Sequence, residues 1–186
     1  MRLHSFPTRR SSDLSWSSPH ALGVVFSPEY GLLAWTPVVA VAIAGLVLLA
    51  TNRAARPDAQ RVGALLVLMC LAQIYTSGIV ESWTVSGSFG QRRFVALTPI
   101  LTIGLATLLA LATQVWARRA VVALVVLCVW WNVGLMVQFG MNRMDRKRLT
   151  LAQNARLTFV TLPFETPGIA WDYLTNRSSF YKRQRQ

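Results

Sequence analysis

Residues 120–139 read AVVALVVLCVWWNVGLMVQF, twenty residues without a charged side chain. An α-helix rises about 1.5 Å per residue, so this run matches the bilayer's hydrocarbon core, which is about 30 Å thick. A helix on the surface of a soluble protein would carry a polar face, and this stretch has none. It therefore predicts a helix that crosses a membrane.

Three similar apolar runs come earlier in the chain, at residues 31–50, 62–80 and 94–116. Only Ala-Arg-Arg at 117–119 separates the last of these from 120–139, which predicts an antiparallel hairpin. The composition agrees, because 53% of the 186 residues are hydrophobic and 14% are charged, whereas soluble domains have about 25% charged residues. We expect an all-α, helical integral membrane protein with about four transmembrane helices within residues 15–148.

The two ends of the chain differ from this apolar region. Residues 4–14, HSFPTRRSSDL, match the in-frame translation of a common sequencing adapter. We interpret residues 1–14 as non-native read-through and exclude them from the fold, and we expect the natural protein to continue upstream. Residues 149–186 are of mixed composition with a basic end, and we predict a short tail that lies on the membrane surface.

The net charge of +12 comes almost entirely from arginine. The arginines lie at the ends of the apolar runs and in the tail, which favours the lipid bilayer as their partner. No nucleic-acid-binding motif accompanies them, so nucleic acid is not expected as a partner. Cys70 and Cys128 fall inside apolar runs and are interpreted as small apolar side chains.

The arginines give two opposing indications of orientation. The loops at 51–61 and 117–119 share one side of the predicted bundle and together carry five arginines, which favours that side as cytoplasmic. The basic run at 142–148 favours the reverse. We place the loop at 81–93 and the C-terminal tail on the external side.

Enzyme motifs of soluble proteins are missing from the sequence. It contains no P-loop, no GxSxG, no HExxH and no dinucleotide fingerprint. Beyond residue 14 the sole histidine is His20, so a histidine-based triad or zinc site cannot be assembled. We predict no metal site and no cofactor, and nothing in the sequence specifically supports a divalent cation.

Residues 86–94, SGSFGQRRF, form a polar, glycine-bearing interruption between apolar runs. Arg92 and Arg93 adjoin the start of the run at 94–116, where a helix N-terminus favours anions. The planar guanidinium matches phosphate, and Gly87 and Gly90 allow close approach of a ligand to the backbone. We predict that a donor phosphate binds at this loop, through the following residues: Arg92, Arg93, Ser88 and Gly90.

Simpler interpretations of these charged residues remain open. Both arginines can extend their side chains to lipid headgroups without binding a specific ligand. Glu29 and Glu81 are expected on the same side of the membrane. They are candidate polar partners of the site or ligands of a cation, or they are ordinary solvated carboxylates.

Two stretches carry a resemblance to a known family. Residues 27–37, SPEYGLLAWTP, are similar to an SPxxGLLxYSP stretch in bacterial multi-spanning glycosyltransferases. Residues 88–94, SFGQRRF, resemble the SFGxRRF or SFGPRYL stretch of the same proteins. These are relatives of the protein mannosyltransferase and aminoarabinose transferase group, whose fold is called GT-C. The resemblance covers about residues 23–110 and corresponds to the C-terminal half of such proteins.

The resemblance implies transfer of a sugar from a polyprenyl-phosphate donor at the outer face of the bacterial inner membrane. It places the catalytic carboxylate in the first external loop, upstream of the matched region, so no catalytic residue is assigned here. We therefore expect the C-terminal membrane part of a glycosyltransferase, inactive alone. The alternative is a non-enzymatic membrane component, such as a polysaccharide flippase, a polymerase subunit or a transporter.

Overall fold

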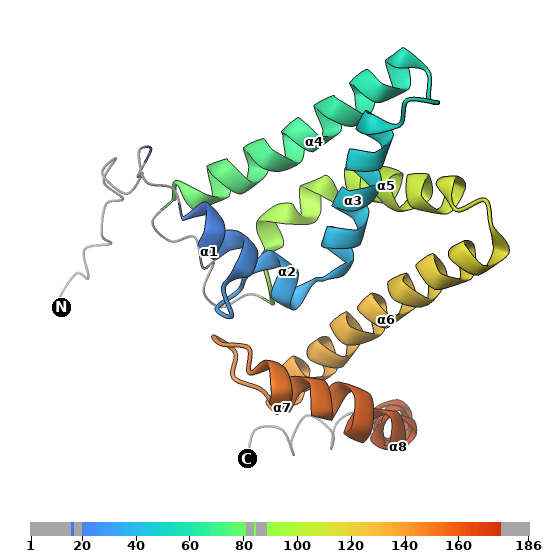
Figure 1. The fold of residues 1–186 in the computed structure, drawn as a ribbon. Coiled ribbons are helices and arrows are strands. Elements are labelled where there is room, and N and C mark those ends of the chain that lie inside the picture. Colours follow the sequence, from blue (N-terminus) through green and yellow to red (C-terminus); the bar gives the residue numbers. More distant parts are fainter. Residues whose placement is uncertain (1–15, 17–19, 81–83, 85–88, 176–186) are drawn as a thin grey trace, which may run out of the picture.

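The computed structural model describes residues 16, 20–80, 84 and 89–175, and these form helices and connecting loops with no strand (Figure 1). Among these described residues, three helices are long and apolar enough to cross a membrane: Pro57–Gly78, Arg92–Leu111 and Val115–Gly140. They indicate a helical membrane protein. In chain order the elements are α1 (Ala21–Phe26), α2 (Leu32–Trp35), α3 (Val38–Thr51), α4 (Pro57–Gly78), η2 (Arg92–Leu97), α5 (Thr98–Leu111), α6 (Val115–Gly140), α7 (Leu151–Arg156), η3 (Leu157–Thr161) and α8 (Leu162–Thr175).

Helix α3 lies at the centre of the first part of the fold, between α4 and α5 (Figure 1). Its Val39 and Leu46 pack in one core cluster with Cys70 of α4 and Phe94 of η2. This placement of Cys70 agrees with its interpretation as a small apolar side chain. The cluster fixes the start of α3 relative to the η2–α5 helix.

The α3–α5 crossing is unusually close because glycines face each other. A Cβ atom added at Gly45 would lie 1.9 Å from the Gly104 carbonyl oxygen, and one added at Gly104 would lie 2.1 Å from the Ala42 carbonyl oxygen. Small residues at helix crossings let backbones approach closely within membranes. Here they set the register between α3 and α5.

The C-terminal region packs against α6 through a buried polar cluster. Gln138 of α6 donates to the Thr158 hydroxyl at 2.8 Å and accepts a hydrogen bond from the Asn154 amide at 2.8 Å. All three side chains are buried, so each polar group has its partner away from water. The predicted surface tail is thus, over residues 151–175, a helical segment joined to α6.

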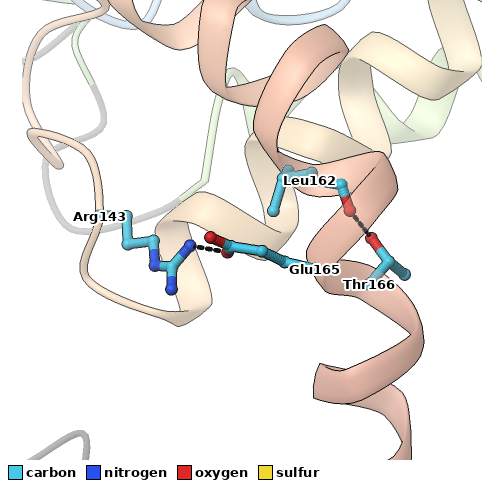
Figure 2. Close-up of polar contacts among 4 residues, drawn as sticks. All are labelled: Arg143, Leu162, Glu165 and Thr166. Atoms are coloured by element: carbon cyan, nitrogen blue, oxygen red, sulfur yellow. Dashed lines mark hydrogen bonds and ion pairs between the residues drawn. The ribbon is translucent and has the colours of Figure 1, made fainter.

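Two further contacts lie around the start of α8 (Figure 2). Arg143, in the loop after α6, forms an ion pair with Glu165. The Thr166 hydroxyl donates to the Leu162 carbonyl within α8. The ion pair is partly exposed, so it contributes little to stability, about 0–1 kcal/mol.

The predicted first span, residues 31–50, is not one continuous helix. It is divided into α2 and the 14-residue α3, with a break at Thr36 and Pro37. Proline has no N–H group and restricts the residue before it, so a helix ends more readily here than it continues. The prediction of four continuous spans is therefore not confirmed, and three helices reach membrane-spanning length.

The boundary between the third and fourth predicted spans is also displaced. Helix α5 ends at Leu111 and α6 begins at Val115, so Ala117, Arg118 and Arg119 lie within α6 and not in a turn. Alanine and arginine are good helix formers, and long arginine side chains can carry their charge out to the interface. The chain reverses direction as predicted, but α5 and α6 diverge from their turn (Figure 1).

Candidate functional site

The break between α2 and α3 leaves carbonyl groups that α6 satisfies. The Val39 amide donates to the Thr36 carbonyl at 3.1 Å. In a regular α-helix it would instead donate to the Trp35 carbonyl. Asn132 Nδ2 donates to that carbonyl at 2.9 Å and to the Thr36 hydroxyl at 3.3 Å. Trp131 Nε1 donates to the Ala34 carbonyl at 3.1 Å. Side chains of α6 therefore act as a cap for α2.

The two stretches that carry the family resemblance meet at this cap. Phe89 packs edge-on against Trp35, with 5.3 Å between ring centroids. Gly90 is buried beside Trp35 and has a φ of 58°, a conformation that glycine adopts without steric penalty. Trp35 is fully buried and stacks on Tyr30 at 5.7 Å. Segments more than 50 residues apart thus form one aromatic cluster.

A groove of about 380 Å³ lies next to this cluster, bordered by α2, α3, η2, α5 and α6. Its wall is mainly apolar, and its polar side chains come from the α2–α3 break, the residue before η2, and the helices η2, α5 and α6. The lining residues are Leu32, Thr36, Val38, Val39, Phe89, Gly90, Gln91, Arg92, Phe94, Val95, Thr98, Leu101, Thr102, Leu105, Asn132 and Met136. The groove is within the usual size range of ligand pockets, about 300–1,000 Å³.

Arg92 and Arg93, both of which the sequence predicts to bind a phosphate, have different surroundings in the structure. Arg92 is exposed and lines the groove. Arg93 is half-buried, and its Nη1 donates to the Ser77 carbonyl at 3.1 Å. The Arg93 carbonyl in turn accepts a hydrogen bond from Gln73 at 3.3 Å. Arg93 therefore ties η2 to the end of α4, and Arg92 alone of the two borders the groove.

The other predicted site residues have different positions. Gly90 lines the groove, whereas Ser88 and Glu81 lie outside the described residues. Glu29 is exposed and is not part of the groove lining. No group of three or more His, Cys, Asp or Glu that could hold a metal ion occurs within the part of the chain that the structure describes.

The sequence-based prediction did not include Asn132 or Thr36. A signal was present for Asn132, because Asn132 and Gln138 are the only amide side chains in the apolar run at 120–139. Polar side chains at membrane depth usually contact other helices or a cavity. Asn132 contacts the end of α2 and also lines the groove. Gln138 contacts the C-terminal helical segment.

Comparisons with protein-family models, curated proteins and solved structures find no match to this chain.

Proposed function

We propose that this chain is the donor-binding membrane part of a glycosyltransferase that uses a polyprenyl-phosphate-linked sugar at the outer face of a bacterial inner membrane. The observation that carries the proposal is the groove, in which an exposed arginine lies at the edge of a mainly apolar wall. A polyprenyl phosphate has the same division, an anionic head joined to an apolar chain. The resemblance of residues 27–37 and 88–94 to glycosyltransferase stretches supports the same assignment, since both stretches border the groove.

Arg92 would bind the phosphate. Among the residues that the structure describes, no hydrogen bond or ion pair engages its guanidinium, so its donors face the solvent or a ligand. The Thr98 hydroxyl donates to the Val95 carbonyl of η2, and the Thr102 hydroxyl donates to the Thr98 carbonyl of α5. Because the donors of Arg92 are not used in this way, Arg92 is the stronger anion-binding group. A fixed fork of N–H donors suits a phosphate better than a single point charge does.

The apolar wall would hold the first isoprene units of the carrier. Val38 and Val39 of α3, Leu101 and Leu105 of α5, and Met136 of α6 line this part of the groove. No carboxylate lines the groove among the described residues. A general base for sugar transfer would therefore come from elsewhere in a complete enzyme.

We also propose that α2 and α3 together complete a fourth membrane segment. Backbone that departs from helical geometry is tolerated at membrane depth where its polar groups are satisfied by protein. The contacts of Trp131 and Asn132 to the Ala34 and Trp35 carbonyls support this arrangement. Cysteine-labelling sites introduced at the exposed positions Glu29 and Arg53, which flank α2–α3, would test it. They should report opposite sides of the membrane if α2 and α3 together span, and the same side if they do not.

The decisive experiment for donor binding uses the purified chain in lipid nanodiscs. Undecaprenyl phosphate should bind, and undecaprenol, which lacks the phosphate, should bind much more weakly. Arg92→Ala should weaken undecaprenyl phosphate binding by about tenfold or more, because charged hydrogen bonds contribute about 1.5–3 kcal/mol. Arg53→Ala is the matched control, since Arg53 is exposed in the α3–α4 loop and outside the groove.

Equal affinity for undecaprenyl phosphate and undecaprenol would refute the phosphate site, as would unchanged binding by Arg92→Ala. The choice between a transferase and a non-enzymatic component needs the upstream coding sequence. An acidic residue in a first external loop, required for sugar transfer in the complete protein, would support the transferase. Its absence would favour the alternative.

A further inference from the structure

Helices α5 and α6 diverge from their turn (Figure 1). A second cavity lies between the C-terminal end of α5 and the first half of α6. This wedge has a volume of about 840 Å³ and is lined by the end of α5, the turn and the first half of α6. None of its lining residues belongs to the groove described above. The wedge is therefore a separate feature of the molecule.

One side of α6 gives the wedge both charge and apolar surface. Arg118, Arg119, Val122, Ala123 and Val126 follow each other at helical spacing and all line it. From Arg119 to Val126 the helix rises about 10 Å, so the charged and apolar ends of this strip are well separated. Both arginines are exposed, and no described residue forms a hydrogen bond or ion pair with either guanidinium.

The neighbouring tryptophan indicates where this end of α6 lies in a bilayer. Trp116 is 71% exposed, and its Nε1 donates to the Gln114 side chain at 3.2 Å. Exposed tryptophans at the ends of spanning helices typically lie at the headgroup level. At that depth the two arginines would lie at the level of the lipid phosphates, and Val122 and Val126 would lie at the level of the acyl chains.

We propose that this wedge is a binding site for one anionic phospholipid, whose phosphate is held by Arg118 and Arg119 and whose acyl chain lies along Val122 and Val126. The positive charge of Arg118 and Arg119 favours an anionic lipid over a second protein in the wedge. An apolar helix of a second protein would offer the two exposed arginines no counter-charge, whereas basic pockets between membrane helices suit anionic headgroups. The inference rests on membrane insertion and does not depend on donor binding at Arg92.

The test measures lipid binding to the full chain by native mass spectrometry, with phosphatidylglycerol and phosphatidylcholine of identical acyl chains. Phosphatidylglycerol should bind more tightly. The double variant Arg118→Ala/Arg119→Ala should weaken phosphatidylglycerol binding by about thirtyfold, given the usual contribution of each arginine near an anionic surface. Phosphatidylcholine binding should change much less. Arg53→Ala/Arg56→Ala is the matched control, because it removes the same charge from an exposed loop outside the wedge.

A second pair of variants tests the cavity without changing charge. Ala123→Trp fills the wedge and should weaken phosphatidylglycerol binding, whereas Ala120→Trp, at an exposed position outside the lining, should not. If the double arginine variant loses its helical circular dichroism signal, its weaker lipid binding reports misfolding. The two tryptophan variants then test whether the wedge binds phosphatidylglycerol. Equal affinity for phosphatidylglycerol and phosphatidylcholine would overturn the proposal. It would also be overturned if each variant and its matched control lost the same amount of phosphatidylglycerol affinity. Cross-linking of two chains through position 123 would overturn it in favour of a second copy as the occupant.

Discussion

The crossing of α3 and α5 gives the sharpest prediction about how the groove is held in shape. In Gly45→Ala the new methyl group would lie 1.9 Å from the Gly104 carbonyl oxygen, where real Cβ contacts are essentially never under 3.0 Å. Both clashing groups belong to helix backbones and cannot rotate away. The helices must therefore separate by roughly 1 Å, which loses packing on both sides of the crossing.

The expected cost follows from two opposing effects. Overpacking of a tight contact costs about 1–3 kcal/mol, and a backbone-to-backbone clash belongs at the upper end of that range. Alanine is the better helix former by about 1 kcal/mol, which offsets part of this cost. We expect Gly45→Ala to lower the free energy of unfolding by about 2 kcal/mol.

The measurement is unfolding in mixed detergent micelles with increasing sodium dodecyl sulfate, followed by far-UV circular dichroism. Gly140→Ala is the matched control, because a Cβ atom there would meet nothing within 4 Å. It should leave the free energy of unfolding unchanged or slightly raised. Gly104→Ala should resemble Gly45→Ala, and the double variant should cost less than the sum, since one separation relieves both clashes. A Gly45→Ala protein as stable as the parent would refute the close crossing.

Three further predictions concern polar contacts, each measured by the same unfolding titration. Asn132→Leu should destabilise the protein by about 1–3 kcal/mol, because the Trp35 carbonyl loses its donor. Gln138→Leu should cost at least as much, about 2–3 kcal/mol, since two buried partners are left unsatisfied; an unchanged stability would contradict the buried cluster. Arg93→Ala should destabilise by about 1–3 kcal/mol through loss of its charged hydrogen bond to α4, whereas Arg92→Ala should stay within about 0.5 kcal/mol of the parent. Equal effects of the two arginine substitutions would show that the distinction between them is wrong.

The sequence by itself determined the class of structure. Long charge-free runs such as residues 120–139 specify helices of bilayer length, because helical rise and hydrocarbon thickness are fixed physical quantities. It also placed the stretches at 27–37 and 88–94 at the starts of apolar segments. The role of these stretches in binding a donor stays a prediction.

The tertiary structure decided which parts of these helices meet. A helix that is apolar around its whole circumference has no distinct apolar face, so its sequence does not predict which side contacts a neighbouring helix. The separation of Arg92 from Arg93 depends on where the end of α4 lies, and the roles of Trp131 and Asn132 depend on a break almost 100 residues earlier. The turn between α5 and α6 lies a few residues before the predicted one at 117–119. The reason is that an arginine can continue a helix while its side chain still reaches the interface. Such choices are set by hydrogen-bond satisfaction and close packing between distant segments, which local sequence patterns do not specify.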